Sequence, residues 1–236
     1  MNRNHYLLIA FCLLFFSKNQ AQNEKDYISF QVDLCWNSEN LELNKDYISN
    51  KDTLKLDLVK FYISDLKIEY NNGSFYNEKN SYHLIDIENK KSLQFLIPRN
   101  TNKISKVIFN VGLDSTTSVS GALSDDLDVT NGMYWAWQSG YINMKIEGTS
   151  KSCKTRKNAF QFHIGGYLKP YYALRKVVLD CNDNNNNNNI GDKILLKVNL
   201  FKLFNTIDLS KNNSIMIPCE KAMKIADNSA EMYSIE

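Results

Sequence analysis

The sequence has few of the features that mark the common catalytic and nucleic-acid-binding classes. Proline occurs only 3 times in 236 residues and helical periodicity is nearly absent, so the pattern favours strands. Lys and Arg number 28 against 26 Asp and Glu, so no basic stripe indicates nucleic acid and no acidic tail is present. The chain contains no GxSxG, no HExxH and no phosphate-binding glycine loop. The familiar hydrolase and nucleotide-binding signatures are therefore missing.

Long apolar runs are also scarce, and the one that exists lies at the N-terminus. It extends from Tyr6 to Phe16 after a short polar region containing Arg3, which is typical of a secretory signal peptide over residues 1–21. Cys12 lies inside this run instead of opening the mature chain, so a lipid anchor is not indicated. No later segment is apolar enough to cross a membrane. We expect a soluble periplasmic or secreted protein that begins near residue 22.

Four cysteines remain after residue 21. An even number in an oxidising compartment favours disulfides, and we expect Cys153 to join Cys181 and Cys35 to join Cys219. Thiolate coordination of a metal is the alternative. The absence of any CxxC pair makes this alternative weaker.

Apolar and polar residues alternate through most of the chain, as in half-buried strands. In "LVKFYISDLKIEY" the apolar parity switches, which predicts a β-bulge near Ser64-Asp65. "NMKIEGTS" and "AFQFHIGGY" are predicted to be neighbouring strands, joined by the loop around Cys153. We therefore predict an all-β protein whose residues 22–210 form an antiparallel β-sandwich with long loops, or an open barrel. Residues 211–236 are expected to form a short helix and a C-terminal tail.

The tract "NDNNNNNNIGD" is of low complexity and is predicted to be an exposed hairpin loop between two strands. A calcium-binding loop is the functional alternative. The tract lacks the alternating carboxylates and closing Glu that such a loop uses.

"MYWAWQSGY" places two of the three tryptophans, Trp135 and Trp137, one residue apart. In a continuous strand they point to the same side as Lys145 and Glu147, away from the core. A bulge at Gly140 would instead turn both indoles inward, as packing residues. Two exposed rings presented together would indicate a partner or a ligand.

Only two histidines follow the predicted signal peptide, His83 and His163. In "FQFHIGGY" the apolar residues alternate inward, so His163 points to the opposite face, and Gly165-Gly166 permits a close approach by a neighbour. An imidazole beside two indoles suits copper better than zinc, which prefers more N and S ligands. His83 in "SYHLID" is a structural residue or a weak second ligand.

"LDVTNGMYWAWQSGYINMKIEGTS" followed by "FQFHIGGY" resembles the MbnP-like copper-binding family, named after methanobactin-associated periplasmic proteins. "KFYISDLKI", "SYHLID" and "VIFNVGLDSTTSVSGALSDDLD" fit the same pattern in order, so the resemblance covers roughly residues 25 to 205. The loop "LDSTTSVSG" departs from it by lacking a histidine, and Val129 stands where proline is expected.

The resemblance implies a periplasmic or secreted β-sandwich. Our first hypothesis is a copper-binding protein without enzymatic activity that acts in metal acquisition or handling. Copper is then bound by histidine together with a tryptophan oxidised to kynurenine, and a dihaem cytochrome c peroxidase-type partner performs that oxidation. Carried onto this chain, the ligand is His163 and the oxidisable residue is Trp135 or Trp137.

Two other functional classes stay open. A sugar- or peptide-binding module would use the same rings as a stacking platform. A glycoside hydrolase would need a carboxylate pair, for which the loop "SDDLD" supplies Asp125, Asp126 and Asp128.

Overall fold

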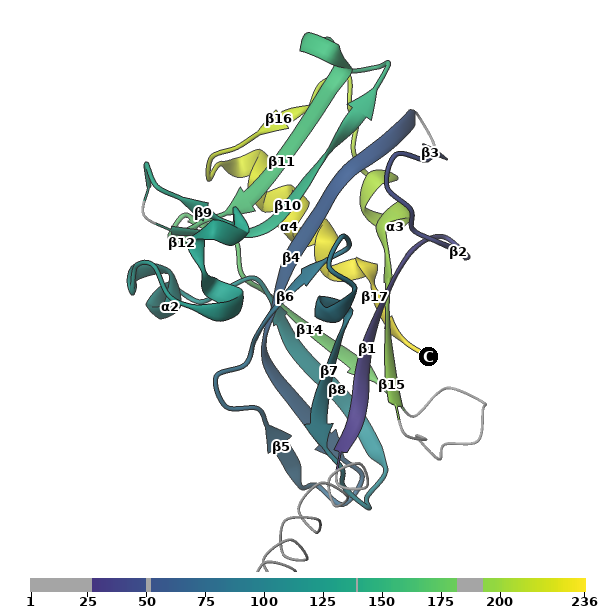
Figure 1. The fold of residues 1–236 in the computed structure, drawn as a ribbon, viewed down its shortest axis with the longest axis vertical. Coiled ribbons are helices and arrows are strands. Elements are labelled where there is room, and N and C mark those ends of the chain that lie inside the picture. Colours follow the sequence, from purple (N-terminus) through teal and green to yellow (C-terminus); the bar gives the residue numbers. More distant parts are fainter. Residues whose placement is uncertain (1–26, 50–51, 139, 182–192) are drawn as a thin grey trace, which may run out of the picture.

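The computed structural model describes residues 27–49, 52–138, 140–181 and 193–236. The predicted signal peptide and the asparagine tract lie outside these ranges. The fold is all-β: two sheets face each other as a sandwich, with a few short helices at the edges (Figure 1). The predicted fold class is therefore confirmed.

The larger sheet is built on β4 (Thr53–Tyr70), which pairs along both edges. Its strand order is β14-β8-β4-β10-β11-β16, with further short strands on β4 and β10. The remaining strands of this sheet are β3 (Asp46–Ile48), β5 (Phe75–Asn77), β6 (Tyr82–Asp86), β8 (Ile104–Val111), β9 (Tyr134–Trp135), β10 (Gly140–Ser150), β11 (Ala159–Gly165), β14 (Arg175–Asp180) and β16 (Ser214–Ile215).

The smaller sheet has the order β17-β15-β1-β2, and β7 also pairs with β1. Its strands are β1 (Tyr27–Trp36), β2 (Glu39–Asn40), β7 (Gln94–Pro98), β15 (Lys193–Asn199) and β17 (Tyr233–Ile235). Most pairs are antiparallel, but β1 and β15 run parallel. A separate hairpin joins β12 (Tyr167–Leu168) to β13 (Tyr171–Tyr172).

The predicted bulge in β4 is confirmed. The register of β4 against β8 shifts between Ser64 and Lys67, and Asp65 has a positive φ of 53°. The extra residue lets Phe61 and Ile63 before the bulge, and Ile68 after it, all enter the same core.

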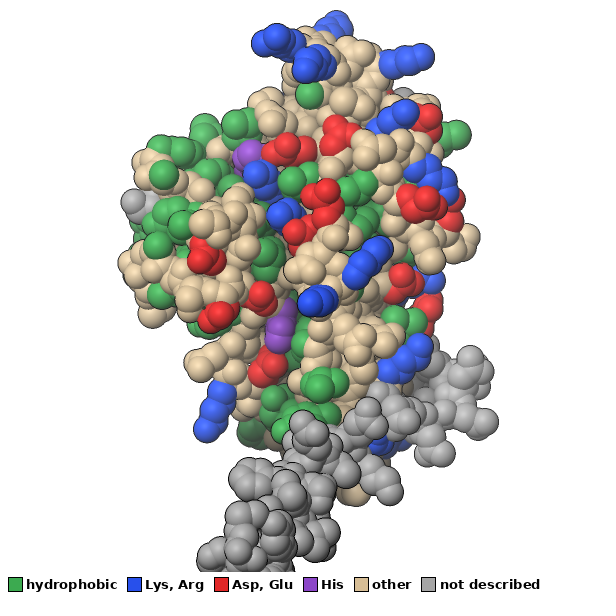
Figure 2. Space-filling view, viewed as in Figure 1, with side chains coloured by type: hydrophobic (Ala, Val, Ile, Leu, Met, Phe, Trp, Pro, Cys, Tyr) green, Lys and Arg blue, Asp and Glu red, His purple; other side chains and the backbone are tan. Residues whose placement is uncertain are grey.

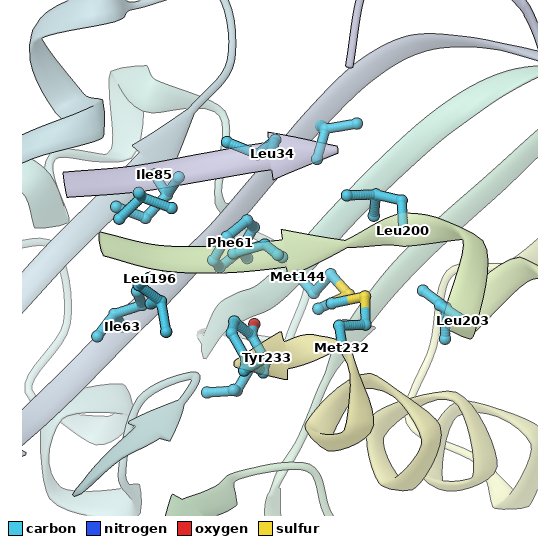
Figure 3. Packing of buried hydrophobic residues seen from close by; sticks show 14 of the residues in the cluster. Leu34, Phe61, Ile63, Ile85, Met144, Leu196, Leu200, Leu203, Met232 and Tyr233 are labelled. Atoms are coloured by element: carbon cyan, nitrogen blue, oxygen red, sulfur yellow. The ribbon is translucent and has the colours of Figure 1, made fainter. Parts of the chain in front are cut away.

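The main core lies between the two sheets. Figure 3 shows Leu34 of β1, Leu196 of β15 and Tyr233 of β17 meeting Phe61 and Ile63 of β4. The five-residue helix α3 and the longer α4 contribute further apolar side chains. The helices are α2 (Ser115–Val119), α3 (Leu200–Phe204), α4 (Glu220–Ser229) and the 3-10 turns η1 (Lys90–Leu93), η2 (Asp125–Leu127), η3 (Val129–Asn131), η4 (Arg156–Asn158) and η5 (Ala230–Met232).

Two segments near the C-terminus differ from the sequence-based expectation. The strands on either side of the asparagine tract, β14 and β15, lie in different sheets and do not pair, so they do not form the predicted hairpin. Residues 211–236, expected to end in a tail, carry β16, α4 and β17, and β17 pairs with β15 in the smaller sheet.

The predicted disulfides are not formed: Cys35, Cys153, Cys181 and Cys219 are all free. Cys153 follows β10, whose end pairs with the start of β4, while Cys181 lies beside the start of β8, which pairs with the end of β4. β4 has 18 residues, so its ends are tens of ångströms apart at about 3.3 Å per residue. A disulfide needs Cα atoms within about 7 Å.

Tyr233 gives a stability prediction. Its ring lies in the main core against Phe61 and Phe109, and its buried hydroxyl has no hydrogen-bond partner among the described residues. Tyr233→Phe removes this uncompensated group, so we expect the free energy of unfolding in urea to rise by about 1 kcal/mol. Tyr47→Phe is the matched control: its buried hydroxyl accepts from the Glu42 N–H at 2.8 Å, and its loss should cost about 1 kcal/mol. Equal destabilisation by both variants would contradict this interpretation.

Candidate metal centre

The tryptophan segment forms a tight hairpin. Trp135 in β9 pairs with Gly140 in β10, so the chain reverses direction between them. Trp135 is 6% exposed, whereas Trp137, in the turn, is 62% exposed. The expectation that both indoles share one face of an extended strand does not hold, because the segment is not one strand. The two rings nevertheless touch, with centroids 5.6 Å apart.

Trp135 belongs to a second apolar cluster, on the face of the larger sheet opposite the main core. In β4 the alternation of side chains sends Phe61 into the main core and Tyr62 into this second cluster. A loop covers it, and the Lys145 ammonium holds that loop by donating to the Gly132 carbonyl at 3.2 Å. The members of the cluster are Tyr62, Leu84, Leu113, Leu127, Met133, Trp135, Tyr141 and Ile142.

Gly165 explains how the indole comes to lie on β11. A Cβ atom at this position would be 2.8 Å from Cζ3 of Trp135 and 2.7 Å from the Tyr141 carbonyl oxygen. Only glycine leaves room for the ring at this distance. The close approach predicted at Gly165-Gly166 is therefore confirmed, and the approaching neighbour is Trp135.

His163 is a half-buried residue of β11 that contacts a carboxylate from β10. Its Nε2 lies 2.7 Å from Oε1 of Glu147, and Nδ1 has no hydrogen bond to the described residues. Burial lowers the pKa of His163 below its usual range; the hydrogen bond to Glu147 opposes this shift and the Lys145 charge adds to it. The ring is therefore neutral near pH 7. Since a carboxylate accepts hydrogen bonds, the proton lies on Nε2 and the lone pair on Nδ1.

His163 and Trp135 lie on the same face of the sheet. Phe162 and Ile164 point into the main core, so His163 and Gly165 both face the other way. Because Trp135 lies against Gly165, its indole is on the same face as His163, whose Cα is two positions from that of Gly165, about 6.6 Å along the strand at 3.3 Å per residue. Trp137 completes the group through its ring contact with Trp135. Of the four predicted site residues, Trp135 and Trp137 touch each other, and His163 shares the face of the sheet on which Trp135 lies.

The fourth, His83, lies elsewhere. It is on β6, which is separated from β11 by β4 and β10, so three strand spacings of about 4.8 Å lie between the two histidines. Its Nε2 contacts Oε2 of Glu78 at 2.7 Å and its ring stacks on Phe95 at 3.7 Å. His83 and His163 therefore do not converge on one ion.

The sequence model of the family described as MbnP matches residues 25–217, most of the chain. The chain belongs to the MbnP family. No curated protein matches it significantly.

A solved structure has the same fold. MbnP from Methylosinus trichosporium superposes on this chain with a TM-score of 0.62 at 13% sequence identity, covering 89% of this chain and 97% of that one. At this identity the likeness concerns the fold alone. Among the described residues of this MbnP-family chain, no helix is long and apolar enough to cross a membrane.

Glu147 is the residue of the candidate site that the sequence did not single out. The alternation of side chains in the sequence could have indicated it, because alternation along β10 places Glu147 on the same outer face as His163 of the neighbouring strand. The pairing of the strands was predicted, but their register was not. In the observed register His163 lies opposite Lys145, which brings Glu147 diagonally to its Nε2.

The carboxylates considered for hydrolysis have structural roles. Asp126 Oδ2 accepts from the Leu84 N–H at 3.0 Å, and Asp128 Oδ1 accepts from the Thr130 N–H at 2.7 Å. Asp125 accepts from the hydroxyl of Ser124. Across the ranges that the structure describes, no three side chains of His, Cys, Asp or Glu gather in the manner of a metal site.

Proposed function

We propose that this MbnP-family chain is an exported, non-enzymatic protein that binds copper and acts in its acquisition or handling. The observation that carries the proposal is a neutral imidazole, His163, whose Nδ1 makes no hydrogen bond to the described residues and which lies on the same face of β11 as the Trp135 indole packed on Gly165. Export follows from the predicted signal peptide, whose residues lie outside the described ranges.

The donor groups fit copper in part. Imidazole is a good ligand for copper, but the Glu147 carboxylate is engaged at Nε2 and an intact indole is not a metal ligand. The folded chain thus offers too few donors as it stands. Oxidation of Trp135 or Trp137 to kynurenine, as the family resemblance implies, would supply an aryl amine and a ketone beside His163. The dihaem peroxidase-type protein remains the proposed oxidising partner.

Glu147 has a specific role in this proposal. A histidine that binds a metal through one nitrogen usually donates its other N–H to a carboxylate, which fixes the tautomer and the orientation of the ring. Glu147 accepts from Nε2 of His163 at 2.7 Å, which leaves Nδ1 as the atom that would bind copper.

The test is elemental analysis and intact mass spectrometry on protein purified from the native host, because a recombinant host lacks the oxidising partner. We expect bound copper and the mass change of one tryptophan converted to kynurenine. Copper-free protein with unmodified tryptophans would contradict the proposal.

A second candidate function is binding of a sugar or peptide, which the exposure of Trp137 favours. At 62% exposure its ring is open to stacking, and Leu168, 64% exposed, is another uncovered apolar side chain. Glycan-array binding that is lost in Trp137→Ala and indifferent to copper would support this function in place of the first.

A further inference from the structure

The loop between β10 and β11, residues 151–158, is the most positively charged segment of the described chain. It carries Lys151, Lys154, Arg156 and Lys157 and no acidic residue, while the whole chain has a formal net charge of +2. The rest of the chain is therefore net negative by two. Figure 2 shows the blue side chains gathered at the tip of the molecule, with no red among them in this view. This segment is called the cationic tip below.

The cations of the tip are available to a partner. All four side chains are exposed, and none forms an ion pair with the described residues. The backbone that carries them is fixed: the buried Cys153 donates its N–H to the Ser150 carbonyl, and the Asn158 N–H donates to the Thr155 carbonyl. The charges are thus presented on an ordered loop.

A groove lies beside the tip, between the loop and the start of β4. Its volume is about 650 Å³, and it is open to solvent. Lys151 and Lys157 of the tip line it together with Lys55 and Ile48, and Ile48 is 73% exposed. Figure 1 shows that β3, the start of β4 and the β10–β11 hairpin all reach this end of the molecule. The groove also holds one carboxylate, Asp46, which pairs with Lys55 at 3.7 Å, so Lys151 and Lys157 are the cations left for phosphate. The rest of the lining is Thr53, Leu54, Thr149, Ser150 and Asn158.

We propose that the cationic tip docks on the surface of an anionic phospholipid bilayer, with lipid phosphates in the groove and Ile48 inserted among the head groups. Three of the four cations are Lys, whose compact ammonium suits a diffuse negative surface better than a defined bidentate partner. No aromatic residue lines the groove, so the base stacking used by single-stranded nucleic acid has no platform there. An exposed isoleucine beside lysines fits the interface of a bilayer, where apolar contact and charge act together.

The expected effect is large and depends on salt. Each Lys or Arg close to an anionic bilayer strengthens binding by about fivefold, so four together contribute roughly several hundredfold. The Debye length, over which dissolved salt screens the attraction between charges, is about 10 Å at 0.1 M salt and about 3 Å at 1 M. Binding should therefore be lost at high salt.

The test is co-sedimentation of the mature protein with vesicles of phosphatidylcholine mixed with phosphatidylglycerol, and with pure phosphatidylcholine. The wild type should bind only the anionic vesicles. The combined variant Lys151→Gln, Lys154→Gln, Arg156→Gln, Lys157→Gln should lose this binding by at least about 100-fold. Ile48→Ser should weaken it by about tenfold without changing its dependence on salt.

The matched control removes the same charge elsewhere, through Lys90→Gln, Lys91→Gln, Lys176→Gln and Lys221→Gln, all at exposed positions. It should keep most of the binding, and thermal melts should show that both quadruple variants are folded. Equal loss in the two variants, or equal binding to neutral vesicles, would overturn the proposal. Binding to a polyglutamate peptide but not to anionic vesicles would also overturn it and would assign the tip to an acidic protein partner.

Discussion

His163→Ala is expected to lower the copper affinity of the native-host protein by more than about 100-fold, because it removes the imidazole of the proposed site. Loss of a carboxylate that only orients a ligand already costs about 10–100-fold, and loss of the ligand itself should cost more. Competition against a chromogenic copper chelator measures the change. His83→Ala is the control: it removes the other described histidine, on β6, and should leave the affinity unchanged.

Glu147 extends this prediction. Glu147→Ala should weaken copper binding by about 10–100-fold, whereas Glu147→Gln keeps an oxygen that accepts from Nε2 and should recover most of the loss. Glu78→Ala breaks the equivalent carboxylate–imidazole pair at His83 and should have no effect. If Glu147→Ala bound copper as the wild type does while His163→Ala did not, the role of Glu147 would be refuted and that of His163 retained.

Gly165→Ala is expected to be the most damaging small substitution in the site. The added methyl would lie 2.8 Å from the Trp135 ring and 2.7 Å from the Tyr141 carbonyl oxygen. Overpacking of this kind costs about 1–3 kcal/mol, and we expect the upper end because one of the two neighbours is backbone. Urea unfolding measures the stability, and tryptophan fluorescence reports whether Trp135 has moved into solvent.

Gly73→Ala separates crowding from backbone strain. No atom lies within 4 Å of a Cβ at Gly73, but its φ is +81°, so alanine there meets strain without contact. It should cost about 1–2 kcal/mol and leave the tryptophan fluorescence unchanged. A Gly165→Ala protein as stable as the wild type would show that Trp135 does not rest on β11.

The sequence was sufficient where a local pattern fixes a local geometry. Alternation identified the inward residues of β11, and the parity switch in β4 identified the bulge at Asp65. The glycine pair after His163 correctly indicated a close neighbour. These features depend on residues within a few positions of each other.

Features that depend on distant partners could not be predicted in this way. Periodicity does not say which strands pair, so the parallel pairing of β1 with β15 and the separation of β14 from β15 were missed. Cys153 and Cys181 were paired because they bracket one predicted strand pair, without knowledge that β4 separates them at its opposite ends. The "WAWQSG" stretch alternates like a strand, and only its pairing with β10 reveals the hairpin.

The hairpin also changes the meaning of the two tryptophans. Trp135 is buried on the same face of the sheet as His163, and Trp137, which touches it, is exposed. The two rings therefore have different roles in the proposal: Trp135 is shielded from solvent, and Trp137 is accessible to a partner.

The most direct test is X-ray diffraction at the copper absorption edge on crystals of the native-host protein. We predict one anomalous peak at bonding distance from Nδ1 of His163, on the side of Trp135, with Glu147 still hydrogen-bonded to Nε2. A peak at His83, or at neither histidine in protein shown to contain copper, would contradict the account.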